Sequence, residues 1–347
     1  MKKKILVIGN LGYVGSVLNK ILFNSNIEVY GIDPNWFSNS INKNDFVHKQ
    51  WNNDFRKLIY DQEVWDINYD AVIYLAAVSN DPMGANFVQV TKQINGEFCI
   101  AAAKKCKDLG IKKFIFASSC STYGLADNNA RKETDEINPI TEYAKSKIFA
   151  ENKLKETCDH TFEVICLRFA TACGSSPNLR LDLVLNDFIT SAHVNKTVEV
   201  LSDGTPWRPL IHVQDMGLSI LWAINYQSKD KFTVVNVGSE RFTFQIKDLA
   251  KKVVEFVPGC ELNISSDKPA DSRSYKVNFS LYHKIADKKF HPKYDIDKAI
   301  EDIYSQIRTL EIEKDFRNSS KWIRLKKLQD NISKSKMNNE LFWIDDN

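Results

Sequence analysis

Tyr143 and Lys147 have the residue types and the spacing that suit acid–base chemistry. They are four positions apart in a stretch with helical periodicity, so both side chains emerge on one face of the predicted helix. The ammonium favours the phenolate and would lower the pKa of the phenol. Tyr294 and Lys298 repeat the spacing. Ser119 distinguishes the first pair, because it ends a predicted strand 24 residues upstream of Tyr143, where carboxyl ends of parallel strands build ligand sites.

Repeated strand and helix units must position these side chains. Short apolar, β-branched runs alternate with amphipathic stretches through the first half of the chain. This alternation predicts an α/β fold with a doubly wound parallel sheet. The predicted strands begin at Ile5, Glu28, Ala71, Lys113 and Phe162, and the predicted helices cover residues 13–23, 93–109 and 142–157.

A second, smaller unit is predicted after about Gly174, where the alternation is lost. We expect residues 1–173 to form a dinucleotide-binding domain of the Rossmann type and residues 174–347 to form mainly a substrate-binding α/β domain. The chain is expected to cross back to the first sheet around residues 207–240. The stretch from Glu313 to Lys336 holds eight basic and three acidic residues. We interpret it as a solvated helical face, with a basic interaction module as the rival hypothesis.

Composition excludes several classes of protein. Lys and Arg number 47 against 44 for Asp and Glu, a balance that argues against nucleic acid as the main partner. The seven cysteines are irregularly spaced and lack zinc-site spacing, so we expect reduced thiols and no metal. No apolar run is long enough to span a membrane, and glycines interrupt the apolar start of the chain. These features predict a cytoplasmic protein without a membrane partner.

The predicted cofactor site is the glycine turn GNLGYVG, formed by Gly9, Gly12 and Gly15 with Tyr13 and Val14 among them. It lies between a buried strand and a helix, so its backbone can approach a pyrophosphate closely and present it to the helix N-terminus.

The next predicted strand ends in Asp33, 18 residues beyond the last glycine. A carboxylate there accepts hydrogen bonds from ribose hydroxyls and repels a 2′-phosphate. No Arg or Lys follows in PNWF to neutralise such a phosphate, and we therefore predict NAD rather than NADP as the cofactor.

With these motifs in order, the sequence resembles the extended short-chain dehydrogenase/reductases that act on nucleotide sugars. That family includes UDP-galactose 4-epimerase and the sugar-nucleotide 4,6-dehydratases. The resemblance spans about residues 4 to 300. The motifs that carry it are GNLGYVG from Gly9, Asp33, LAAVSNDP from Leu75, Asn95, SSCSTYG from Ser118, YAKSK from Tyr143, LRFATACG from Leu167 and WRPLIHVQD from Trp207.

The resemblance implies roles for the catalytic and cofactor-binding residues. Tyr143 would be the general base, Lys147 would help to keep it ionised and bind the cofactor, and Ser119 would hydrogen-bond the reacting oxygen. Asp54 matches an adenine contact, although its position equally suits a helix N-cap. The cofactor's path would be lined by Leu75, Ala76 and Ala77, and Asn95 would be a further cofactor-binding residue.

The resemblance also implies a nucleoside-diphosphate sugar as the substrate. Arg208 matches an arginine that binds the diphosphate, which suits a planar guanidinium. Asp271 matches a ribose-binding acid, but Lys268 stands where the epimerases usually have Arg. The remaining expected substrate contacts are Ser119, Cys120, Ser121, Thr171, Leu183, Val184 and Asn186.

The residues after Ser119 discriminate between reactions. The 4,6-dehydratases of the family carry an acidic pair there, which removes a proton from carbon 5 and helps water to leave from carbon 6. This chain has Cys120 and Ser121. We therefore expect oxidation at carbon 4 in a nucleotide-sugar 4-epimerase. The alternatives are a 4-dehydrogenase that releases the keto sugar and, less favoured, a 4,6-dehydratase.

Cys120 is interpreted as a packed, inert thiol, with an acid or base as the alternative.

Assembly and biological role are expected from the resemblance alone. Helices around 96–109 and 143–157 resemble those that pair in family dimers, which predicts a homodimer through a four-helix bundle. A role in surface-polysaccharide synthesis is implied in the same way. A dinucleotide-sensing protein that has lost its chemistry is a further alternative, but such a protein should lack the Ser, Tyr and Lys set that is complete here.

Overall fold

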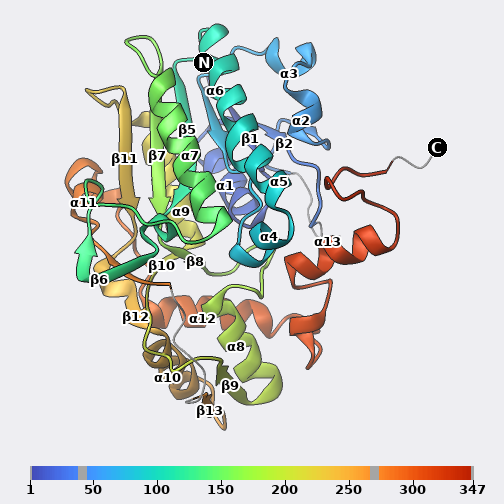
Figure 1. Cartoon of the computed structure of the whole chain (residues 1–347), viewed down its shortest axis with the longest axis vertical. Coiled ribbons are helices and arrows are strands. Elements are labelled where there is room, and N and C mark those ends of the chain that lie inside the picture. Colours follow the sequence, from blue (N-terminus) through green and yellow to red (C-terminus); the bar gives the residue numbers. More distant parts are fainter. Residues whose placement is uncertain (1, 38–44, 266–272, 345–347) are drawn as a thin grey trace.

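The structure, a computed structural model, describes residues 2–37, 45–265 and 273–344. Its centre is a seven-stranded parallel sheet (Figure 1). The run of apolar residues in each inner strand is buried because helices cover both faces. In spatial order the strands are β11 (Phe232–Val237), β7 (Glu163–Phe169), β5 (Lys113–Ser119), β4 (Ala71–Tyr74), β1 (Lys4–Ile8), β2 (Glu28–Ile32) and β3 (Lys49–Trp51). The predicted doubly wound α/β fold is confirmed.

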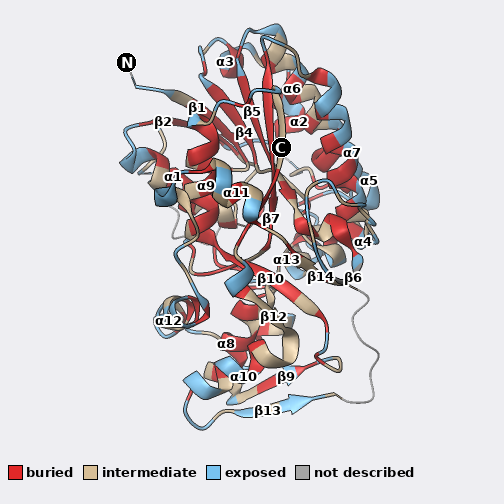
Figure 2. Ribbon diagram, turned by 90° about the vertical axis from the view of Figure 1, so that its left-hand side faces the viewer, coloured by how far each residue is buried: buried red, intermediate tan, exposed pale blue. Residues whose placement is uncertain are grey.

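Two apolar cores lie on opposite faces of this sheet. Residues of α1 (Tyr13–Asn24) and α9 (Val213–Asn225) pack against one face. Figure 2 shows the strands buried between the helical layers. The helices that contribute to the core on the other face are α2 (Phe55–Leu58), α3 (Gln62–Trp65), α6 (Phe98–Asp108) and α7 (Glu142–Thr157).

A smaller unit lies beyond the carboxyl ends of the central strands (Figure 1). Its apolar core joins α8 (Val184–Asn195), α10 (Ile246–Phe256) and α12 (Ile296–Ile307). The strands of this region form small sheets, namely β8 (Thr171–Cys173) with β10 (Trp207–His212) and β12 (Thr243–Gln245), and β9 (Thr197–Val200) with β13 (Glu261–Ile264). The chain returns to the central sheet through α9 and β11, the latter pairing with β7.

Shorter elements connect these layers and surround the carboxyl edge of the sheet. They comprise α4 (Asp81–Asn86), α5 (Val88–Lys92), a π-helical turn (Gln93–Glu97), β6 (Leu125–Arg131) paired with β14 (Ser274–Val277), α11 (Ser280–Ile285), α13 (Arg324–Ser333), and 3₁₀ turns at Cys120–Tyr123, Glu240–Phe242, Lys288–Phe290 and Phe316–Asn318. Across the described ranges, none of the helices combines the length and apolar character needed to cross a membrane.

Candidate active site

One cavity of about 900 Å³ lies at the carboxyl edge of the sheet, between the central sheet and the smaller unit. Its wall includes the glycine turn after β1 and the Ser119, Tyr143 and Lys147 side chains. The parallel topology explains this meeting, because every central strand delivers its following loop to the same edge. Residues from across the chain therefore surround one space.

The glycine turn is shaped by close backbone approach. Gly9 has a φ of 92°, a backbone conformation that favours glycine. A side chain would not fit there, because a Cβ would lie 2.6 Å from the Ala76 amide nitrogen. A Cβ on Gly15 would lie 2.6 Å from Asn10 Cα. Gly12 precedes α1 without a side-chain cap, so the first N–H groups of the helix are left for another acceptor. This turn fits a dinucleotide pyrophosphate.

Asp33 follows β2 and contacts the backbone of the glycine turn. Its carboxylate accepts hydrogen bonds from the backbone N–H of Leu11 at 3.1 Å and of Asn35 at 2.8 Å. Burial raises the pKa of Asp33 to about 6, although those two N–H donors oppose the rise. The carboxyl group also lines the cavity, where the sequence predicts a ribose contact.

We expect this raised pKa to make NAD binding depend on pH. Below about pH 6 the Asp33 carboxyl becomes protonated and loses capacity as an acceptor for ribose hydroxyls. The affinity for NAD should therefore fall by up to about tenfold between pH 7 and pH 5. Calorimetric titration at a series of pH values measures the effect. Asp33→Asn should bind more weakly and lose this pH dependence, and an unchanged profile in that variant would contradict the assignment.

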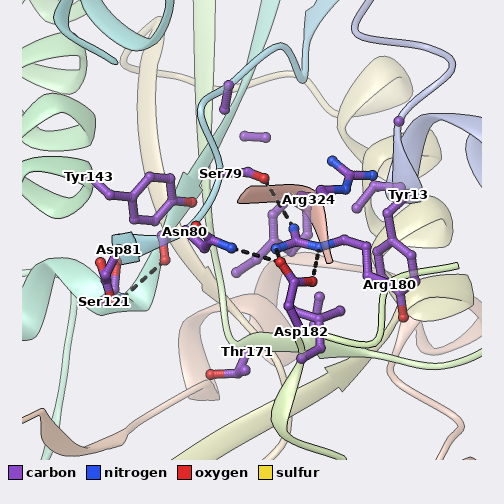
Figure 3. A pocket seen from close by; sticks show the side chains of 18 of the residues that line it. Tyr13, Ser79, Asn80, Asp81, Ser121, Tyr143, Thr171, Arg180, Asp182 and Arg324 are labelled. Carbon is purple, nitrogen blue, oxygen red and sulfur yellow. Dashed lines mark hydrogen bonds and ion pairs between the residues drawn. The ribbon is translucent and has the colours of Figure 1, made fainter. Parts of the chain in front are cut away.

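Tyr143 and Lys147 lie one turn apart on α7, which begins after the N-cap Thr141. Lys147 Nζ donates to the carbonyl oxygen of Ala117 at 2.8 Å and lies 5.6 Å from the Tyr143 ring centroid. Ser119 ends β5 and hydrogen-bonds to the Tyr143 phenol. The helix and the strand thus place the three side chains on the wall of the cavity, where Figure 3 shows Tyr143.

The pKa of Tyr143 departs from the sequence prediction. Burial raises it to about 12, and the hydrogen bond from Ser119 only partly opposes that rise. Burial also lowers the pKa of Lys147 to about 8. Among the protein's own groups, desolvation therefore outweighs the expected lowering of the phenol pKa by the ammonium.

Some of the other predicted cofactor residues line the cavity, and one lies behind its lining. Leu75, Ala76 and Ala77 line the cavity after β4. Asn95 lies behind the wall, where it accepts a hydrogen bond from the Val78 N–H at 2.8 Å and donates to the Val78 carbonyl oxygen at 3.1 Å. The amide of Asn95 thus holds the loop after β4, and its cofactor contact stays a prediction.

Asp54 has both of the features considered for it. Its carboxylate caps α2 by accepting from the Arg56 N–H at 2.8 Å and also pairs with the Arg56 guanidinium at 2.8 Å. Asp54 nevertheless lines the cavity on the side of Asp33. The N-cap is shown directly, and the adenine contact stays a prediction.

Most of the predicted substrate residues line the cavity, but one lies behind its lining. Thr171, Leu183, Val184, Ser121 and Arg208 line the cavity. Asn186 instead lies behind it, with Nδ2 donating to the carbonyl oxygen of Arg180 at 2.9 Å and Oδ1 accepting from the Gly174 N–H at 3.2 Å. Its predicted substrate contact is therefore wrong, since both ends of the amide bind backbone. Asp271 lies outside the described residues.

Cys120 does not face the cavity. It is fully buried, its Sγ donates to the carbonyl oxygen of Arg168 at 3.1 Å, and burial raises the pKa of the thiol far above its usual range. The predicted substrate contact of Cys120 is therefore wrong. Its neighbour Ser121 lines the cavity and has a buried Oγ without a hydrogen-bond partner among the described residues.

This placement predicts that Cys120→Ala leaves turnover nearly unchanged. A neutral, buried thiol supplies neither a base nor an acid to a ligand in the cavity. Product formation under saturating substrate measures the outcome, with wild-type protein assayed in parallel. A loss of roughly 10²-fold or more, the range of a general acid or base, would contradict it.

A polar network on the opposite wall was missed at the sequence level (Figure 3). Arg180 Nε donates to Asp182 at 2.8 Å, and Arg180 Nη1 donates to Ser79 Oγ at 3.1 Å. Asn80 Nδ2 donates to the other oxygen of Asp182 at 2.8 Å. The charged pair in RLDL, within an otherwise apolar stretch, was a signal that could have revealed this network.

Asp81 adds a carboxylate close to Tyr143 that was also missed. Its charge raises the pKa of the Tyr143 phenol, and its Oδ2 pairs with Arg273. It belongs to the LAAVSNDP motif but comes 38 residues before Ser119, so the local pattern SSCS did not indicate it. An acidic group is therefore present in the cavity even though Cys120 and Ser121 replace the expected pair.

Comparison with known proteins identifies the class. The model of the NAD dependent epimerase/dehydratase family matches residues 5–238, and the chain belongs to that family. The cofactor of the family is NAD, as the glycine turn and Asp33 predicted. The resemblance to the nucleotide-sugar short-chain dehydrogenase/reductases is confirmed.

Curated and solved relatives agree with this family. The chain is 26% identical over 320 residues to UDP-glucose 4-epimerase of Streptococcus mutans, covering 81% of this chain and 94% of that protein. The fold matches the UDP-glucose 4-epimerase of Bifidobacterium longum in complex with NAD⁺ and UDP with a TM-score of 0.77, 20% identity and coverage of 88% and 98%. It also matches an NAD dependent NDP-hexosamine 5,6-dehydratase with a TM-score of 0.76, 19% identity and coverage of 89% and 98%.

Proposed function

We propose that this protein is an NAD-dependent nucleotide-sugar 4-epimerase. The observation that carries the proposal is that the glycine turn and the Ser119, Tyr143 and Lys147 set line one cavity. That cavity continues to Arg208, Thr171 and Leu183 beside the smaller unit, and is large enough for two ligands. The similarity to UDP-glucose 4-epimerases supports the same reaction class.

The protein's groups have defined tasks in this proposal. NAD, when bound, supplies the hydride acceptor. Tyr143 takes the proton of the substrate 4-hydroxyl and returns it at the end of the reaction, and Ser119 hydrogen-bonds that oxygen. Lys147 supplies a cation beneath the phenol, held in place by Ala117. Arg208, 8% exposed, contributes positive charge for the diphosphate of the substrate.

A panel of UDP, dTDP, GDP and CDP sugars tests the reaction. Products are identified by mass and NMR while bound NADH is followed by its absorbance. A product of unchanged mass with inverted configuration at carbon 4 supports the epimerase. Loss of two hydrogens would instead show a 4-dehydrogenase, and loss of water would show a dehydratase.

The dehydratase is retained as a second candidate because of Asp81. This carboxylate lies near Tyr143 and has an Oδ1 that is buried without a hydrogen-bond partner among the described residues. It offers the acid or base that elimination requires and that Cys120 does not supply. Asp81→Asn separates the cases, since an elimination would lose its acid or base, whereas an epimerase depends on Tyr143.

We also propose that the protein acts in the cytoplasm as a homodimer, with α6 and α7 of two copies forming a four-helix bundle. These two helices pack on the same face of the central sheet, and α7 carries Phe149 with 47% of its surface exposed. An exposed aromatic on a helix beside another helix suits such an interface. Light scattering of the purified protein should give twice the chain mass of 39.8 kDa, and a monomeric mass would remove the proposal.

A further inference from the structure

The chain beyond the smaller unit returns to the cavity and packs across its cofactor side. We call residues 313–344 the C-terminal strap. Phe316 and Trp322 of the strap share an apolar cluster with Tyr13 and Val17 of α1. Figure 1 shows α13, which follows α12 in the chain, near the carboxyl edge of the sheet. The strap lies outside the region matched by the family model, residues 5–238.

The other end of the strap is anchored near β2 and β4. Leu328, Met337 and Leu341 are buried in one cluster with Trp36 and Val78. This contact fixes α13 against the loops that follow β2 and β4. The strap is therefore held by two separate apolar clusters.

Hydrogen bonds add to this second anchor. Trp343 Nε1 donates to the carbonyl oxygen of Pro34 at 2.6 Å, directly after Asp33. Arg56 Nη2 donates to the carbonyl oxygen of Glu340 at 2.8 Å, and its guanidinium lies 3.8 Å from the Phe342 ring centroid. The strap thus ends over the adenosine side of the predicted NAD site.

Arg324, the first residue of α13, brings a positive charge to the cavity wall. It is 8% exposed, and its guanidinium lies 4.4 Å from the Phe37 ring centroid. Its Nη2 is buried without a hydrogen-bond partner among the residues that the structure describes. The prediction that the basic stretch forms only a solvated helical face is therefore wrong at this residue.

The groups around Arg324 do not neutralise it fully. The nearby charge of Arg180 repels it, whereas Asp182 and Asp33 attract it. Arg180 and Asp182 already pair with each other at 2.8 Å, and Asp33 already accepts two backbone hydrogen bonds. A buried cation with an unused donor is costly unless an anion completes it.

The position of Arg324 indicates which anion this would be. Figure 3 shows its guanidinium beside Tyr13, the first residue of α1, and beside Arg180. The N-terminus of α1 is where the glycine turn presents uncapped N–H groups. Two independent features, the helix start and the buried donor, thus converge on one place.

We propose that Arg324 donates a hydrogen bond to the pyrophosphate of NAD, so that the C-terminal strap forms the outer wall of the cofactor site. In this arrangement the strap, which packs against Tyr13 and Val17 of α1, covers the cofactor site beside the glycine turn. It couples cofactor retention to the packing of Trp322 and Leu328. This inference rests on the placement of NAD in the cavity.

Binding of separate parts of the dinucleotide tests the proposal. Calorimetric titrations compare NAD, ADP-ribose, adenosine and NADP on the full chain carrying Arg324→Gln, Arg324→Met or Arg324→Lys. The two neutral variants should bind NAD and ADP-ribose about 10- to 100-fold more weakly, the effect of a lost hydrogen bond to a charged group. Adenosine, which has no phosphate, should bind as in wild type, and Arg324→Lys should recover part of the loss.

Matched controls separate charge from packing. Lys326→Gln removes the same charge from an exposed position on α13 and should leave NAD binding within about twofold. Without ligand, Arg324→Met should unfold at or above the wild-type temperature because it removes an unpaired buried cation. With saturating NAD, its rise in unfolding temperature should be smaller than that of wild type.

Three results would overturn the proposal. Equal weakening of NAD and adenosine would show that Arg324 only supports the fold of the strap. Weakening of NADP without NAD would place the contact at a 2′-phosphate, and unchanged binding of all ligands would show no contact. Gly15→Ala tests the premise that NAD binds at the glycine turn, and intact NAD binding in this variant would show that the placement of NAD is wrong. If Gly15→Ala loses NAD binding while the Arg324 variants bind NAD as wild type does, only the role of Arg324 is refuted.

Discussion

Tyr143→Phe will lower turnover of the nucleotide-sugar substrate by roughly 10²–10⁴-fold, the contribution of a positioned general base. The variant removes only the phenolic oxygen that takes the proton, and the ring still fills its half-buried position on α7. Ser119 and Lys147 remain, but neither can replace the phenol, since the Lys147 ammonium already donates to the Ala117 carbonyl oxygen. The rate is measured by NMR detection of product with saturating substrate.

Binding measurements show whether this loss is chemical. The glycine turn follows β1 and Asp33 follows β2, whereas Tyr143 lies on α7, so Tyr143→Phe should keep its affinity for NAD within a few-fold of wild type. Ser119→Ala, which removes a hydrogen-bond donor but not the base, should lose less turnover than Tyr143→Phe. Persistent turnover in Tyr143→Phe would overturn the assignment of the base and with it the proposed function.

Glu151→Ala will lower the free energy of unfolding by about 3–5 kcal/mol, because it leaves the buried charge of Arg168 unpaired. The two side chains are 4% and 6% exposed, and Arg168 Nη2 donates to Glu151 at 2.6 Å. Glu151 also accepts from the Ser118 hydroxyl, directly before Ser119. The pair therefore ties α7, which carries Tyr143, to β5 and β7. Urea unfolding followed by circular dichroism measures the change.

An exposed glutamate on the same helix provides the control. Glu156 pairs with Lys153 at 2.9 Å, but its side chain is 63% exposed. Glu156→Ala should therefore cost less than about 1 kcal/mol. The double variant Glu151→Leu with Arg168→Met should be more stable than either single variant, since apolar side chains of similar size leave no unpaired charge. If Glu151→Ala lowered the free energy of unfolding no more than Glu156→Ala does, the stabilising role of the Glu151–Arg168 pair would be contradicted.

Several elements could be predicted because their signals are local. The helix predicted over residues 142–157 matches α7 from Glu142 to Thr157. Both its N-cap and its apolar periodicity depend on residues that are close together in the sequence. The predicted helix over 93–109 is helical, but its first turn, Gln93–Glu97, is a π-helix. Nothing in the local periodicity distinguishes that turn, because its shape depends on how it packs against α7.

Side-chain direction could not be predicted from position along the motifs. Cys120 follows Ser119 directly, yet it points into the core because the 3₁₀ turn at Cys120–Tyr123 turns it toward Arg168. Asn95 and Asn186 matched family positions, but both amides hold loops behind the wall. A motif fixes which residues come near a site, whereas backbone geometry decides which of them face it.

Sequence by itself determined the alternation of strands and helices, the glycine turn, Asp33 and the Ser119, Tyr143 and Lys147 set, because these depend on residues close together in the chain or on the rule that parallel strands end at one edge. Only the tertiary structure decided that Arg324 reaches the cavity, 291 residues after Asp33. It also placed Asp81 beside Tyr143 and buried Glu151 against Arg168. The physical reason is that burial and pairing of charges depend on packing between distant segments, which composition and spacing do not specify.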